Sequence, residues 1–89
     1  MGYEYKIETY DSGRAKLQEF LSRQSEFLRE DDGTLYFGSP PNDILVTVKI
    51  ETEYVYVCQH ASSRVADALL GLITRHLLSS NDQVVISEL

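Results

Sequence analysis

The chain has 89 residues, 43% hydrophobic and 25% charged, a composition typical of a folded globule and unlike that of a disordered segment. Its 14 acidic and 8 basic side chains give a net charge of −6, a field that repels nucleic acid and anionic membranes and attracts a basic protein. The single cysteine, Cys58, excludes an internal disulfide and fits a reducing compartment.

Residues 3–10 alternate between two sets of side chains, which is typical of a half-buried strand. The sets are Tyr3, Tyr5, Ile7 and Thr9 on one side, and Glu4, Lys6, Glu8 and Tyr10 on the other. The pattern leaves open which set faces the core. The Asp11-Ser12-Gly13 segment that follows predicts a helix N-cap, because short side-chain oxygens can accept hydrogen bonds from the first free backbone N–H groups.

The next segment is amphipathic and predicts a helix. Its apolar arc contains Leu17, Phe20, Leu21, Gln24, Phe27 and Leu28. Two ends are compatible with this pattern. The helix either continues to Leu28, or it breaks near Ser25 so that residues 27–30 form a strand paired with residues 35–37 across an Asp-Gly turn. We favour the continuous helix.

Residues 34–38 predict a short strand, which ends at the Ser39-Pro40-Pro41-Asn42 loop because proline cannot donate to a sheet. Two further strands are predicted between Asp43 and His60, joined by a turn near Glu51-Thr52. The apolar side chains of the first strand are at even positions, Val46, Val48 and Ile50, and those of the second are at odd positions, Val55 and Val57. An even-membered turn therefore places all five on one sheet face.

Ser62 or Ser63 is expected to cap a second helix that runs to about Ser79. A wide apolar arc along it is typical of a helix that packs on a sheet: Val65, Ala66, Leu69, Leu70, Leu72, Ile73, His76 and Leu77. Residues 83–89 contain Val84-Val85-Ile86 and predict a short, well-covered closing strand.

These elements predict one α+β domain spanning residues 1–89. We expect a two-layer sandwich with an antiparallel or mixed sheet of four to five strands and two helices on one face. The order β-α-β-β-(β)-α-β makes the fold ferredoxin-like or a variant of it. Residues 1–20 contain no long apolar run, so we expect a cytoplasmic protein without a signal peptide or membrane span.

The sheet face opposite the helices is the first candidate site. It would carry Thr47, Lys49, Tyr54, Tyr56, Cys58 and His60. Tyrosine combines an apolar body with a hydroxyl that tolerates water, which is why interfaces favour it. We therefore predict partner binding by Tyr54, Tyr56 and Lys49. We also expect the acidic turn residues Glu30, Asp31 and Asp32 to dock a basic partner.

Cys58 and His60 form a second candidate, because a thiol and an imidazole can serve as nucleophile and base or bind a metal. Their spacing places them about 7 Å apart at Cα, which is loose for proton transfer. The chain contains no GxxxxGK[ST], GxGxxG, GxSxG, HExxH or paired CxxC motif. No catalytic residue, cofactor or metal ligand set is therefore assigned.

The sequence favours a small non-enzymatic interaction module. It would be an acidic binder or inhibitor of a basic protein, or a homodimer that uses the tyrosine-bearing face. Nucleic acid and membranes are not expected as partners. The alternative is a small enzyme or metal- or ligand-binding module centred on Cys58 and His60.

Overall fold

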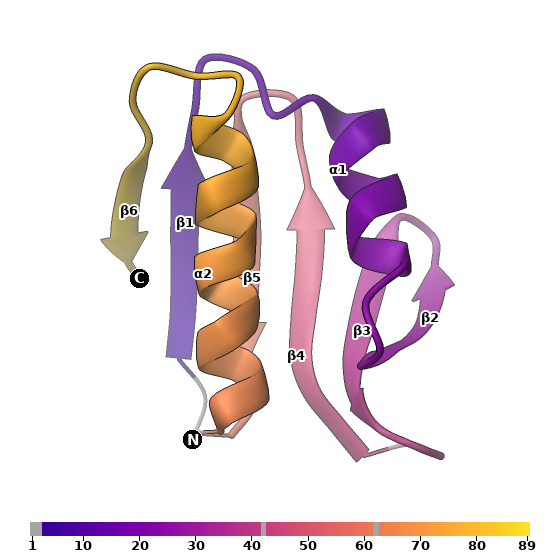
Figure 1. Cartoon of the computed structure of the whole chain (residues 1–89). Coiled ribbons are helices and arrows are strands. Elements are labelled where there is room, and N and C mark those ends of the chain that lie inside the picture. Colours follow the sequence, from indigo (N-terminus) through magenta and orange to yellow (C-terminus); the bar gives the residue numbers. More distant parts are fainter. Residues whose placement is uncertain (1–2, 42, 62) are drawn as a thin grey trace.

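Residues 3–41, 43–61 and 63–89, which the computed structural model describes, form a six-stranded antiparallel sheet with two helices on one face (Figure 1). The elements are β1 (Tyr3–Glu8), α1 (Arg14–Ser22), β2 (Phe27–Asp31), β3 (Thr34–Ser39), β4 (Asp43–Ile50), β5 (Tyr54–Gln59), α2 (Arg64–Leu78) and β6 (Val85–Glu88). The strand order is β2-β3-β4-β5-β1-β6. No helix within the described residues is long and apolar enough to cross a membrane.

The predicted α+β class with two helices is confirmed, but the expected number of strands was wrong: the described residues form six strands rather than four or five. The additional strand is β2, which pairs with β3 at one edge. At the other edge, β1 lies between β5 and β6, so α2 connects two strands that are separated by β1. Neighbouring strands in this order are all antiparallel, so of the two expected arrangements, antiparallel or mixed, the antiparallel one is confirmed.

The preference for a continuous first helix was also wrong, and the alternative of a break near Ser25 is confirmed. The helix α1 ends at Ser22, and Phe27 begins β2. The apolar spacing fits both structures, so tertiary pairing decides between them. In the observed fold the ring of Phe27 meets that of Phe37 edge-on at 5.7 Å, and β2 gains the backbone hydrogen bonds of β3.

The turn between β2 and β3 supports this pairing. Asp32 and Gly33 both have positive φ angles, 52° and 81°, as the two central residues of a type I′ hairpin require. The Gly33 N–H donates to Glu30 Oε2 at 3.0 Å, so the Glu30 side chain closes its own turn. Local turn chemistry thus fixes the register of the added strand.

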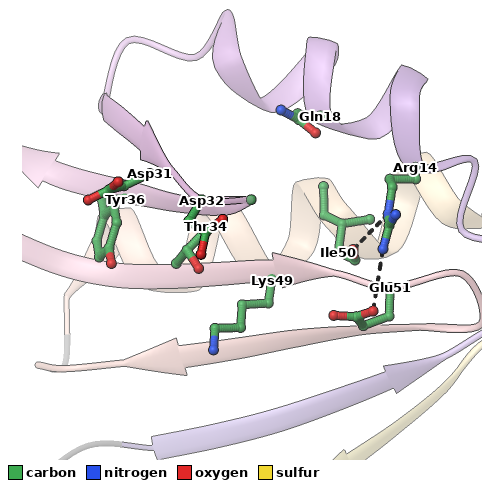
Figure 2. A pocket seen from close by; sticks show the side chains of 10 residues that line it. Arg14, Gln18, Asp31, Asp32, Thr34, Tyr36, Lys49, Ile50 and Glu51 are labelled. Carbon is green, nitrogen blue, oxygen red and sulfur yellow. Dashed lines mark hydrogen bonds and ion pairs between the residues drawn. The ribbon is translucent and has the colours of Figure 1, made fainter.

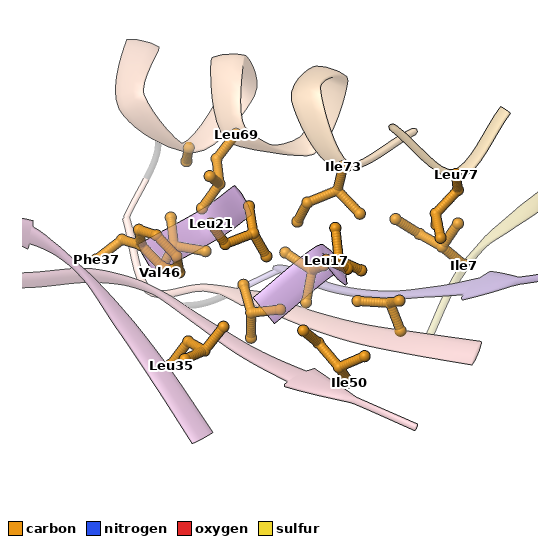
Figure 3. Packing of buried hydrophobic residues seen from close by; sticks show 14 residues of the cluster. Ile7, Leu17, Leu21, Leu35, Phe37, Val46, Ile50, Leu69, Ile73 and Leu77 are labelled. Carbon is orange, nitrogen blue, oxygen red and sulfur yellow. The ribbon is translucent and has the colours of Figure 1, made fainter. Parts of the chain in front are cut away.

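The hydrophobic core lies between the sheet and the helices (Figure 3). It confirms the prediction that the apolar positions change from even in β4 to odd in β5. The five side chains predicted to share one face of β4 and β5 are all buried with those of the helices. The complete set is Ile7, Leu17, Leu21, Leu35, Phe37, Val46, Val48, Ile50, Val55, Val57, Ala66, Leu69, Ile73 and Leu77. The opposite sheet face remains free for other roles.

The predicted N-cap of α1 was wrong. Gly13 occupies the cap position with φ 58° and provides no side chain, while Asp11 Oδ1 accepts only from the Gly13 N–H. Ser12 is buried because it binds the β4–β5 turn: its hydroxyl donates to the Glu51 carbonyl and its N–H to the Thr52 carbonyl. Ser12 therefore joins two loops instead of capping the helix, and the Asp11 side chain stays within its own loop.

Buried Asn81 makes the matching connection from α2. Its amide nitrogen donates to the carbonyls of Leu77 and Asp11 at 2.8 and 2.9 Å, and its Oδ1 accepts from the Asp11 N–H at 3.1 Å. The end of α2 is thereby tied to the β1–α1 loop, whose next residue, Ser12, is tied to the β4–β5 turn. One polar cluster holds three connections at the same end of the molecule.

The second helix is confirmed from Arg64 to Leu78. The Ser63 hydroxyl accepts from the Ala66 N–H at 3.0 Å and caps it, whereas the alternative cap, Ser62, lies outside the described residues, as does Asn42 of the predicted proline loop. The expectation of a well-covered last strand was wrong. The strand β6 lies at the sheet edge, where Val85 and Ile86 remain 48% and 44% exposed.

We predict opposite effects of alanine at two glycines. A Cβ on Gly38 would lie 1.9 Å from the Asp43 carbonyl oxygen, whereas a Cβ on Gly71 meets nothing within 4 Å. Gly38→Ala should lower the free energy of unfolding by about 1–3 kcal/mol or more through overpacking. Gly71→Ala should raise it by about 0.5–1 kcal/mol through helix propensity. Urea denaturation monitored by circular dichroism measures both, and equal effects would contradict the β3–β4 geometry.

Asn81→Ala should lower the free energy of unfolding by about 1–3 kcal/mol, because it removes the side-chain hydrogen bonds to the carbonyls of Leu77 and Asp11 and to the Asp11 N–H. The neighbouring exposed residue provides the control, Asp82→Ala, which should change stability little. The two variants are compared by urea denaturation. Equal stability of both would show that the polar cluster does not hold the three connections.

Candidate functional site

The face of the sheet opposite the core is the candidate site, and we call its side chains the open face. Strand pairing places partners on the same face, so Tyr54, Tyr56 and Cys58 of β5 lie beside Glu8, Lys6 and Glu4 of β1. On β1, β3, β4 and β5 the open face therefore comprises Glu4, Lys6, Glu8, Thr34, Tyr36, Thr47, Lys49, Tyr54, Tyr56 and Cys58. The question left open by the sequence is settled: Tyr3 and Tyr5 lie on the helix side.

Tyrosines and charges contact one another across this face. The Tyr56 hydroxyl donates to Glu4 Oε1, and the Lys6 ammonium lies 4.7 Å from the ring centre of Tyr54. On β3, the Tyr36 ring has the Arg29 guanidinium at the same distance, 4.7 Å. Cation–π contacts of this kind hold aromatic rings in place while their edges stay exposed. The aromatic surface is thus ordered before any partner arrives.

The hydrogen bond from Tyr56 to Glu4 raises the pKa of the Tyr56 phenol well above its ordinary value of 10, with smaller contributions from burial and from Cys58. The bond stabilises the neutral phenol, because a phenolate would lose its donor and face the Glu4 carboxylate. Tyr56 consequently remains an uncharged donor throughout the neutral range. It is suited to positioning and contact rather than to proton transfer.

A hollow of about 560 Å³ adjoins the open face at the end of β4 (Figure 2). Arg14 and Gln18 from α1 line one side, and Asp31, Asp32 and Gly33 of the β2–β3 turn line another. The remaining lining residues are Thr34, Tyr36, Lys49, Ile50 and Glu51. Its charged groups have both signs, with carboxylates in excess.

Arg14 fixes one wall of this hollow. Its Nε donates to the Ile50 carbonyl at 3.1 Å, and its Nη2 pairs with Glu51 Oε2 at 3.3 Å. Helix α1 is thereby connected to the end of β4. Since Arg14 already neutralises Glu51, the carboxylates of Asp31 and Asp32 remain to attract a cationic group from outside.

Lys49 and Glu51 also line a second, smaller hollow of about 340 Å³ with Tyr54 and Tyr56. The two hollows therefore meet at the end of β4. Through this junction the acidic turn and the tyrosines of β5 belong to one surface, although more than twenty residues separate them in the sequence. We call this combined surface the β4-end groove.

The structure thus brings together five of the six predicted partner-binding residues: Lys49, Tyr54, Tyr56, Asp31 and Asp32 line the groove. The sixth, Glu30, instead accepts the turn N–H of Gly33. Sequence reasoning missed Arg14, Gln18 and Tyr36. Only Tyr36 carried a signal, because its alternation with Leu35 and Phe37 already placed it on the outer side of its strand.

Cys58 lies on β5, but His60 follows the end of this strand at Gln59, so the two do not share a strand as predicted, and the imidazole is engaged elsewhere. His60 Nε2 lies 2.7 Å from Thr47 Oγ1, and the Cys58 thiol is half-buried beside Tyr56. Within residues 3–41, 43–61 and 63–89, no group of three or more His, Cys, Asp or Glu side chains is placed to hold a metal ion. Comparisons with protein-family models, curated proteins and solved structures found no match.

We expect Glu4→Gln to shift the ionisation of one tyrosine to lower pH, because the neutral amide no longer disfavours a phenolate at Tyr56. Absorbance titration of the folded protein between neutral and alkaline pH measures this shift. Glu8→Gln is the matched control on the same strand and should leave the curve unchanged. An unchanged curve in Glu4→Gln would contradict the Tyr56–Glu4 hydrogen bond.

Proposed function

We propose that this chain is a small non-enzymatic interaction module that binds a basic protein segment in the β4-end groove. The observation that carries the proposal is the junction of the two hollows at Lys49 and Glu51, which joins the partly exposed Tyr54 and Tyr56 to the carboxylates of Asp31 and Asp32. Aromatic side chains would supply contact area, and the carboxylates would supply attraction and orientation. The module would act by occupying its partner, as a binder or inhibitor does.

Charge supports a basic partner. The chain carries a formal charge of −6, which accelerates encounter with a cationic surface and disfavours nucleic acid. Asp31 and Asp32 lie on the tight β2–β3 turn, where the backbone is fixed and the side chains are exposed. An arginine or lysine entering the groove would meet them without displacing an internal salt bridge.

The proposal extends to the fold family and the compartment. Without the β2–β3 hairpin, the elements follow the order β-α-β-β-α-β, which supports a ferredoxin-like variant extended by that hairpin. A single free cysteine and an acidic surface support a cytoplasmic location. Such small two-layer folds host many functions, so the groove and not the fold carries the functional argument.

A labelled arginine-rich peptide should bind the protein, and its affinity should fall as salt rises, because the attraction is partly between exposed charges. Two variants should weaken binding: Asp31→Asn with Asp32→Asn, and Tyr54→Ala with Tyr56→Ala. Asparagine tolerates the positive φ of residue 32, so the turn is kept. Fluorescence anisotropy measures the affinities, and circular dichroism should show unchanged helicity.

Tyr10→Ala is the matched control, because Tyr10 is 91% exposed and lies outside the groove. It should bind the peptide as the unaltered protein does. Equal binding of a glutamate-rich peptide of the same length, or full binding by both groove variants, would overturn the proposal. Loss of helicity in the tyrosine variant would instead contradict the assignment of Tyr54 and Tyr56 to the open face.

A further inference from the structure

The two edges of the sheet differ in how they are protected. The edge strand β2 carries three consecutive charged side chains, Arg29, Glu30 and Asp31, and its pairing with β3 is interrupted by a bulge after Phe27. Charges and bulges are the devices by which proteins prevent an edge from pairing with another chain. The other edge strand, β6, has a regular register with β1 and contains Val85, Ile86, Ser87 and Glu88.

The backbone of β6 presents unpaired groups on its outer side. The Leu89 N–H donates to the Glu4 carbonyl of β1 at 2.8 Å. Backbone groups alternate in direction along a strand, so those of Val85 and Ser87 also point to β1, whereas those of Ile86 and Glu88 point outward. Within the described residues β6 pairs with β1 alone. Ile86 and Glu88 therefore offer two N–H and two C=O groups to a further strand.

Apolar side chains accompany this free edge. Four large aliphatic side chains are exposed in the described structure, and three of them, Val85, Ile86 and Leu89, lie on β6 or directly after it, whereas the fourth, Leu78, ends α2. Ile86 is 44% exposed although it pairs with Ile7, which is fully buried. It therefore lies at the margin of the core, where β6 extends beyond the cover of α2 (Figure 1). A further strand would complete this layer.

Charge favours a second copy of this chain at that position. Residues 83–89 contain one charged side chain, Glu88, in a molecule whose formal charge is −6, so little charge repulsion opposes a second copy at this edge. A two-fold axis through Ile86 makes the strand complementary to itself. Ile86 then opposes its own copy, Val85 opposes Ser87, and each Glu88 opposes Val84 at the ends of the ladder, where the two carboxylates are far apart.

We infer that β6 pairs with the β6 of a second copy in antiparallel fashion and joins the two sheets into one. A two-fold axis perpendicular to the sheet keeps both sets of helices on one side and both open faces on the other. The dimer would thus carry two β4-end grooves on the same surface. The inference stands independently of the proposed function, because it uses neither the open face nor the groove. The ladder is short, so the association should be weak and depend on concentration.

Amide hydrogen exchange measured by NMR at several protein concentrations tests this directly. In the dimer the Ile86 and Glu88 amides become hydrogen-bonded, so their exchange should slow as concentration rises. The Ser87 amide already points to β1 and should show no comparable dependence, which makes it an internal control within the same strand. Concentration-independent exchange at Ile86 and Glu88 would overturn the inference.

Light scattering over about a hundredfold range of concentration supplies the second measurement, since mass action should raise the average mass from the monomer towards twice that value. Ile86→Lys should remain monomeric, because a charge at the axis would oppose its own copy. Ala68→Lys adds the same charge on an exposed position of α2 and should dimerise like the unaltered protein. A monomer at every concentration, or a dimer that persists in folded Ile86→Lys, would overturn β6 pairing.

Discussion

The structure depends on one constraint. Because the helices cover a single face of the sheet, apolar side chains must point to that face and polar ones to the other, so the two kinds alternate along each strand. Because β4 and β5 exchange even for odd apolar positions across their turn, Val46, Val48, Ile50, Val55 and Val57 all enter the same core. Because side chains alternate along a strand, the residues next to these five point to the exposed face of the sheet. The same constraint that builds the core therefore gathers Lys49, Tyr54 and Tyr56 on the open face, so core and candidate site are two results of one pattern.

The polar cluster at one end of the molecule complements this core. A domain of this size buries little apolar surface, and its connections need their own stabilisation. Asn81 and Ser12 provide it by satisfying backbone groups of three different loops. The β4–β5 turn held by Ser12 also contains Glu51, which pairs with Arg14 in the groove. The groove is consequently built on a fixed end of the sheet rather than on a free loop.

The β2–β3 hairpin shows how one local decision changes the surface of the whole molecule. Had the first helix continued to Leu28, Asp31 and Asp32 would have followed a helix end, far from a sheet register. As a strand with a type I′ turn, the segment instead places both carboxylates beside Lys49. It also forms a charged, bulged edge that contrasts with β6. The two edges thus differ in their capacity to pair with another chain.

The sequence by itself determined the elements with strong periodicity: β1, the β4–β5 hairpin with its inner and outer faces, and α2, whose cap it narrowed to Ser62 or Ser63. Alternation and helical spacing are local properties, so they can be recognised without knowing the neighbours. Only the tertiary structure decided the rest. The segment from Gln24 to Leu28 fitted a helix and a strand equally, and pairing with β3 selected the strand. Asp11 and Ser12 had cap chemistry, but the Ser12 hydroxyl bonds the distant β4–β5 turn and the Asp11 side chain bonds Gly13 in its own loop. The apolar run Val84-Val85-Ile86 predicted a covered strand, but the strand lies at an exposed edge of the sheet. The groove is formed by residues of α1, β2, β3, β4 and β5 that only folding brings together, because strand order cannot be derived from local patterns.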